Sequence, residues 1–238
     1  MLYWIVATVA AFFVKGLCGF ANTLVFTSIL SFGVSNANIS PVELLLGFPT
    51  NVILAWKERK SIRWGICLPL ALLVVIGTIP GALFLKNADS GSIKIVFGVI
   101  IVLIGLEMLL RSRNTAGLKQ SKVVLVIIGI LSGVLCGLYG VGALLGAYIS
   151  RVTDDSHSFK ANICTVFVIE NVLRIILYSV WGILTFDIFR QAVVLIPFML
   201  IGLCAGMLSG KFLDEKIVRK LVILMLIISG AALIVTNI

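Results

Sequence analysis

Long apolar segments separated by short polar stretches dominate the chain. The runs at 65–85, 93–110, 186–209 and 217–235 contain few or no charged residues, and no polar stretch exceeds about twelve residues. About 20 apolar residues span the hydrocarbon core of a bilayer, so several of these runs are long enough to be transmembrane helices. The pattern predicts an all-α polytopic membrane protein with no room for a soluble domain.

Two glycine-rich clusters that resemble each other interrupt apolar segments. Residues 16–24 read GLCGFANTL and residues 137–145 read GLYGVGALL, an offset of 121. One helix over 2–33 would measure about 48 Å, which exceeds the roughly 30 Å hydrocarbon core. Half-helices over 2–15 and 20–33, each about 21 Å long, would instead enter to the middle of the bilayer and return. The corresponding pieces of the second half are 123–136 and 141–150.

The duplication extends well beyond these clusters. The small-residue pair Gly77-x-x-x-Gly81 recurs as Gly202-x-x-x-Gly206. Pairs with this spacing typically form surfaces on which two membrane helices pack closely. Each half is expected to hold a glycine-broken segment and three helices. The chain then divides into a first repeat (1–110), a basic cytoplasmic linker (111–122) and a second repeat (123–238).

The composition excludes a soluble nucleic-acid-binding protein. The 238 residues are 61% hydrophobic and 12% charged, with a net charge of +9. A soluble domain is about a quarter charged. In a membrane protein a positive balance is expected, because Lys and Arg accumulate in the cytoplasmic loops. The expected partners are therefore the lipid bilayer and a small substrate, with no nucleic acid, and a homodimer stays open.

The distribution of positive charge favours one membrane topology. If the broken segments crossed the membrane, eight loop Lys and Arg residues would lie on one side and nine on the other. If they are re-entrant hairpins, fourteen lie on one side and three on the other. The second arrangement obeys the positive-inside rule. It predicts six full spans, two re-entrant hairpins, inverted repeats and external termini, with a longer or tilted crossing as the alternative.

Each glycine cluster is expected to begin a half-helix near mid-membrane, at Phe20 and at Val141. The first N–H groups of a helix have no intrahelical partner and carry roughly half a positive charge. Two such starts predict an anion site, and glycine lets the backbone approach a ligand closely. The alternative is that the glycines serve helix packing alone. The candidate substrate-binding residues are Gly19, Phe20, Ala21, Asn22, Thr23, Gly140, Val141, Gly142, Asn51, Asn171 and Lys15.

Several polar residues fall inside apolar segments, where a charge costs about 2.5–3.5 kcal/mol on insertion scales. Lys15 either adds positive charge to the site or stabilises the end of the first half-helix. Asn51 and Asn171 occupy equivalent positions and are expected to line one cavity, with interhelical hydrogen bonding as the alternative. Arg174 follows Glu170 by four residues, which favours an ion pair over a proton-coupling role for Glu170.

No catalytic, metal or cofactor site is expected. The five cysteines lie in apolar segments and form no C-x-x-C pair, so they do not indicate a redox or metal centre. The sequence G-x-x-x-x-G-K-[ST] is absent, so ATP is not expected to drive the protein. The leading hypothesis is secondary transport of a small anion. The alternatives are a passive anion channel and, less favoured, an intramembrane thiol–quinone oxidoreductase.

The chain resembles the TauE/SafE family of sulfite exporters and related organosulfur-anion transporters over nearly its whole length. The resemblance rests on the duplicated form, the glycine-rich start of each half, the loop RKSIRW at 59–64, Gly77-x-x-Pro80-Gly81 and the basic linker. The family usually has more glycine where this chain has Phe20, Ala21 and Asn22. The resemblance implies transport of sulfite, sulfoacetate or a similar anion across the cytoplasmic membrane.

Overall fold

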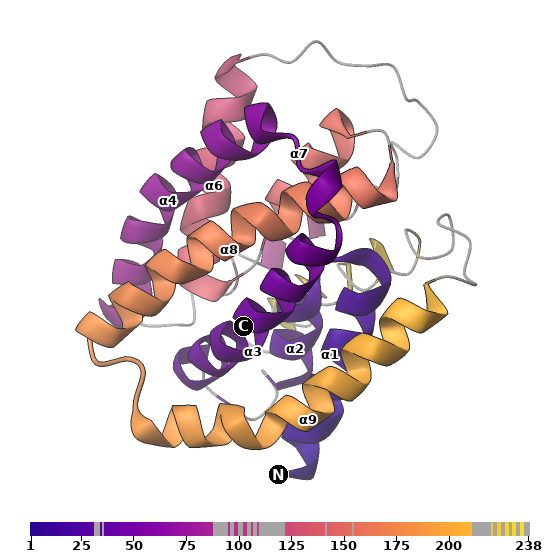
Figure 1. Cartoon of the computed structure of the whole chain (residues 1–238). Helices are drawn as coiled ribbons and strands as arrows, with labels where there is room; N and C mark the ends of the chain where they lie inside the picture. The colour runs from indigo at the N-terminus through magenta and orange to yellow at the C-terminus, as the bar shows by residue number, and fades with distance from the viewer. Residues whose placement is uncertain are drawn as a thin grey trace.

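The computed structural model is all-helical wherever it describes the chain. It describes residues 1–30, 34, 36–87, 122–140, 142–153 and 155–210, with isolated helical positions between 95 and 109 and between 220 and 235. Within these ranges there are eight α-helices, one short 3-10 helix and no strand (Figure 1). The elements are α1 (Leu2–Cys18), α2 (Asn22–Leu30), α3 (Asn36–Lys57), η1 (Arg59–Ser61), α4 (Trp64–Asn87), α6 (Lys122–Tyr139), α7 (Ala143–Val152), α8 (Ser156–Val180) and α9 (Phe186–Ser209).

Four of the described helices are long and apolar enough to cross a membrane, namely α3, α4, α8 and α9. On α4 the side chains of Leu68, Leu72 and Ile76 are more than half exposed, at a spacing of four residues. Residues at this spacing share one helix face, so α4 presents an apolar stripe suited to lipid. The chain is therefore a polytopic membrane protein. The expected spans at 93–110 and 217–235 lie largely outside the described residues.

Both glycine clusters contain a helix end. α1 ends at Cys18, and Gly19 follows with φ 86° and an N–H that donates to the carbonyl of Lys15 at 2.7 Å. α6 ends at Tyr139, and Gly140 follows with φ 71° and an N–H that donates to Cys136 at 2.7 Å. A left-handed residue after a helix end is normally glycine, because it has no Cβ to clash. A left-handed glycine thus follows the end of both helices.

The helix bounds differ from the expected half-helices by two or three residues. α1 extends to Cys18 instead of residue 15, and α6 extends to Tyr139 instead of residue 136. α2 begins at Asn22 and α7 at Ala143, each two residues late. In the first break this shift follows from Ala21, whose φ of 70° is left-handed and therefore keeps the residue out of the right-handed helix.

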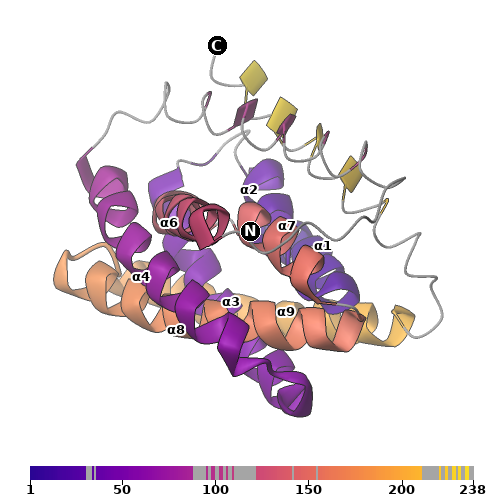
Figure 2. The ribbon, with the colours of Figure 1, turned by 90° about the horizontal axis from the view of Figure 1, so that it is seen from above.

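Helices of the first half of the chain pack against helices of the second half. α4 packs along α6, and α1 packs along α9, while α3 contacts α8 between them (Figure 2). At the first contact Gly77 and Gly81 of α4 meet the backbone of α6, and at the second Gly206 of α9 meets Gly16 of α1. The Gly-x-x-x-Gly pairs therefore bring helix backbones together, as small residues do in membranes.

Adding a methyl group in the α4–α6 contact is expected to destabilise the protein. A Cβ on Gly133 would lie 2.8 Å from the Cα of Gly77 and 2.9 Å from the N of Thr78. We expect Gly133→Ala to lower the free energy of unfolding by about 1–3 kcal/mol, as overpacking does. Gly65→Ala is the matched control, because its Cβ would meet nothing within 4 Å. Equal thermal unfolding of the two purified variants in detergent would contradict this packing.

Candidate functional site

A polar cavity lies where the two helix breaks meet. It is bordered by the start of α2, the residues before α7, and the middle of α3 and α8. Its volume is about 20 Å³, counted as the space open to the centre of a water molecule, which is enough to hold a water. Its walls are formed by Phe20, Ala21, Asn22, Thr23, Leu24, Glu43, Asn51, Gly140, Gly142, Phe167 and Asn171.

Eight of the eleven sequence-predicted binding residues line this cavity. Gly19 and Lys15 are not among its walls: a Cβ on Gly19 would meet Cγ of Lys160 at 2.7 Å, and Nζ of Lys15 donates to the carbonyl of Gly47 at 3.3 Å. Val141 lies outside the described residues. The structure thus gathers most of the predicted residues in one place, and their role in substrate binding stays a prediction.

Two helix N-termini open toward the cavity. Asn22 and Thr23 form the start of α2, and Gly142 precedes the start of α7. No side chain in the described part of the chain caps the N-terminus of α7. The first backbone N–H groups of a helix have no intrahelical partner, and at α7 no side-chain cap from the described residues supplies one. Negative charge is stabilised at such helix ends by the N–H groups and by the helix dipole.

The two equivalent asparagines approach the cavity from opposite halves of the chain. Asn51 lies on α3 and Asn171 on α8, and each is only 4–6% exposed. The Oδ1 of Asn51 is buried and has no hydrogen-bond partner among the described residues. Buried polar atoms are normally hydrogen-bonded, so an acceptor of this kind at a cavity wall suits a bound water or ligand. The Oδ1 of Asn51 is therefore able to accept a hydrogen bond from a bound group.

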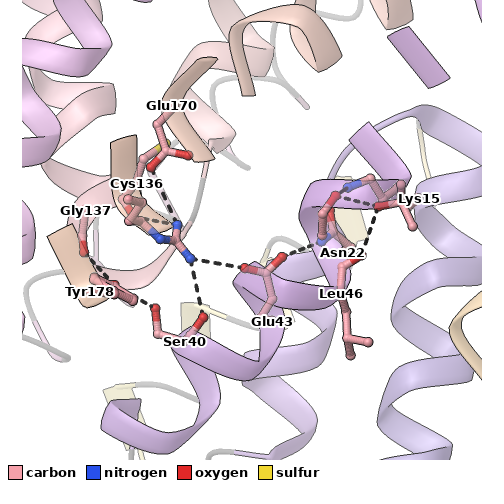
Figure 3. Close-up of polar contacts among 12 residues, drawn as sticks. Lys15, Asn22, Ser40, Glu43, Leu46, Cys136, Gly137, Glu170 and Tyr178 are labelled. Atoms are coloured by element: carbon pink, nitrogen blue, oxygen red, sulfur yellow. Dashed lines mark hydrogen bonds and ion pairs between the residues drawn. The ribbon is translucent and has the colours of Figure 1, made fainter. Parts of the chain in front are cut away.

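A buried network of charged side chains reaches the cavity at Glu43, which lines it, and extends to Arg174 and Glu170 (Figure 3). The Arg174 guanidinium donates from Nη1 to the carbonyl of Cys136 at 2.9 Å and from Nη2 to that of Ser40 at 3.4 Å. Its Nη2 also lies 3.4 Å from Oε2 of Glu43, and its Nη1 lies 3.6 Å from Oε1 of Glu170. The pairing expected between Arg174 and Glu170 is present, and Glu43 is a second acidic partner.

Glu43 is the functional candidate that the sequence reasoning missed. Its Oε1 accepts a hydrogen bond from Nδ2 of Asn22 at 2.5 Å, so one carboxylate joins the helix break to Arg174. The sequence does mark this residue, because Glu43 is the one acidic residue in the 22 residues of α3. An acidic residue inside a transmembrane segment is costly and usually has a partner or a task.

The buried ionisable groups balance one another. Lys15 and Arg174 are each 1% exposed, Glu170 is 1% exposed and Glu43 is 4% exposed. Their formal charges sum to zero when all four are ionised. A neutral cluster avoids the several kcal/mol that an uncompensated buried ion costs. Among the described residues, this network included, no group of three or more His, Cys, Asp or Glu is placed to hold a metal ion.

These features define a polytopic helical membrane protein with a charged network beside a central polar cavity. Comparison with known families then identifies the group: the model of the sulfite exporter TauE/SafE family matches residues 3–233, and the chain belongs to this family. Its members are membrane transporters, not enzymes, and they carry small anions. No curated protein and no solved structure gives a significant match.

Proposed function

We propose that this protein is a secondary carrier or exporter of a small anion, either sulfite or an organosulfur anion. The anion binds in the central cavity, between the N-termini of α2 and α7. The observation that carries the proposal is the meeting of two helix N-termini, one from each half of the chain, at one polar cavity. Such termini stabilise an anion by unpaired N–H groups and by the helix dipole.

The same packing supports an inverted-repeat architecture with re-entrant breaks. Exchanging α1, α3 and α4 for α6, α8 and α9 turns the α1–α9 contact into the α6–α4 contact, and leaves the α3–α8 contact unchanged. That relation is what a two-fold axis between two repeats produces. Transporters built from such repeats bind substrate at mid-membrane, between broken helices. We place the protein in the cytoplasmic membrane, with repeats at 1–110 and 123–238.

Topology is testable by cysteine labelling in intact cells. In a variant without native cysteines, Phe186→Cys is expected to react with an impermeant maleimide added outside, and Lys60→Cys is expected to react after the cells are opened. Both positions are exposed, so access to the reagent depends on the side of the membrane. The reason is the positive-inside rule applied to the loop 57–63. Reaction of Lys60→Cys from outside would contradict the inverted arrangement.

Flux into proteoliposomes tests the function. Purified protein is reconstituted, and uptake of sulfite, sulfoacetate and methanesulfonate is followed under imposed pH and voltage gradients. A carrier accumulates one of these anions against its own gradient when another gradient is supplied. A passive channel only equalises the concentrations. Absence of any protein-dependent flux of these three anions would overturn the proposed function.

A further inference from the structure

A carboxylate occupies the donors that an anion in the cavity would need. Glu43 lines the cavity, and its two oxygens face different donors: Oε1 accepts from Asn22 Nδ2 at 2.5 Å, and Oε2 lies 3.4 Å from Nη2 of Arg174. In Figure 3 Glu43 lies between Asn22 on one side and Ser40, Cys136 and Glu170 on the other. Asn22 lines the cavity and Arg174 does not, so an ionised Glu43 and a bound anion would compete for the Asn22 side chain.

Charged and titratable groups surround Glu43 from three further helices. α1 contributes Lys15, α6 contributes Cys136, and α8 contributes Glu170, Arg174 and Tyr178, all of which interact electrostatically with Glu43 or through Arg174. α2 contributes the uncharged Asn22. The ionisable groups of α9, the remaining neighbour of α3, are exposed: Asp187, Arg190 and Cys204.

With Lys15, Arg174, Glu43 and Glu170 all ionised, this environment is neutral before a substrate enters, because two buried cations balance two buried carboxylates. A monovalent anion adds one negative charge to a cavity whose walls are largely buried. Leaving one buried charge uncompensated costs several kcal/mol. One proton taken up together with the anion restores neutrality and also removes the repulsion between the anion and Glu43.

On the basis of the proposed transport function, we propose that Glu43 is the proton-binding residue of the transport cycle. In the empty cavity its carboxylate holds Asn22 and Arg174. When the anion enters, a proton from the same aqueous phase binds a Glu43 carboxylate oxygen, and the Asn22 amide turns to the anion. On the other side the anion leaves and the proton returns to water. No bond within the substrate forms or breaks.

Glu170 is less suited to this role. It does not line the cavity and lies behind the guanidinium, where its Oε1 is 3.6 Å from Nη1 of Arg174. An anion in the cavity therefore does not displace Glu170 from its partner. Glu170 keeps Arg174 neutralised when Glu43 is protonated. Glu43 therefore binds the transported proton, and Glu170 forms the structural ion pair with Arg174.

The test compares accumulation with exchange in proteoliposomes whose membrane potential is held at zero. The probe is methanesulfonate, which carries one negative charge that does not change near neutral pH. Sulfoacetate, a dianion there, replaces it where the wild-type protein transports only that anion. One proton per monovalent anion supports an accumulation ratio of about tenfold per unit of pH difference. In Glu43→Gln the accumulation ratio is expected to fall to one. Anion–anion exchange needs no net proton movement and is expected to fall far less.

Glu43→Asp, which keeps a titratable group, is expected to restore part of the pH-driven accumulation, and Glu170→Gln is expected to retain it. Wild-type protein in weakly buffered detergent should take up about one proton per methanesulfonate bound, a measurement that does not depend on any variant folding. Full pH-driven accumulation by Glu43→Gln, or no proton uptake by the wild type, would overturn the role of Glu43. Flux that ignores pH leaves the transport function standing, whereas no wild-type flux at all removes the transport function itself.

Discussion

Replacing Arg174 with glutamine is expected to lower the free energy of unfolding by about 3–5 kcal/mol, the usual cost of breaking a buried ion pair by removing one partner. Arg174 is 1% exposed and lies within 3.6 Å of two carboxylates, those of Glu43 and Glu170. Without the guanidinium both buried carboxylates lose the cation that lies within 3.6 Å of them. Thermal or denaturant unfolding of the purified protein in detergent measures the loss.

The surrounding charges supply controls for this expectation. Arg190→Gln removes the same group from an exposed position at the start of α9 and is expected to change stability by less than about 1 kcal/mol, as surface charges do. Glu170→Gln is expected to cost less than Arg174→Gln, because Glu43 still neutralises the guanidinium. Adding Glu43→Gln and Glu170→Gln to Arg174→Gln should recover stability. Equal stability of Arg174→Gln and Arg190→Gln would contradict a structural role for the network.

Gly140→Ala is expected to reduce transport to the background of empty liposomes. Gly140 has φ 71°, and a Cβ there would lie 2.7 Å from Nη1 of Arg174 and 2.8 Å from Oε2 of Glu43. The methyl group would therefore push apart the ion pair behind the cavity and fill part of the cavity wall. The left-handed backbone adds roughly 1–2 kcal/mol of strain for a residue with a Cβ. Anion uptake per correctly folded protein is the measurement.

Two other glycines separate backbone strain from crowding. Gly182 has φ 70°, yet a Cβ there meets nothing within 4 Å, so Gly182→Ala carries the strain alone and is expected to retain transport. Gly19 has φ 86°, and its Cβ would meet Cγ of Lys160, a flexible side chain that can move. Gly19→Ala should therefore give an intermediate loss. A loss in Gly182→Ala equal to that in Gly140→Ala would show that strain, rather than the cavity, explains the effect.

The sequence predicts the presence of the helix breaks better than their bounds. The glycine clusters at 16–24 and 137–145 predict that a helix ends there. In the structure a left-handed glycine follows the end of α1 and of α6. The start of α2 follows Ala21, a buried residue with φ 70°. Residues with a Cβ rarely adopt this conformation, and composition gives no sign of it.

The pairing of helices between the two halves is not readable from the sequence. The pattern Gly77-x-x-x-Gly81 predicts a packing surface without naming the partner, which proves to be α6. For Glu43, too, the sequence shows that the residue is unusual but does not show which residues it contacts. Its position in an apolar run marks it as important, but its contacts are 21 and 131 residues away along the chain, at Asn22 and Arg174.

The central claim, that the transported anion binds between the two helix breaks, is tested most directly by locating an anion in the protein. Selenite is the selenium analogue of sulfite, and its selenium gives an anomalous signal in crystals of the unmodified protein. We predict a peak in the cavity, within hydrogen-bonding distance of Asn22 and the first N–H groups of α7. An empty cavity with a peak elsewhere, at a selenite concentration that blocks transport, would contradict the account.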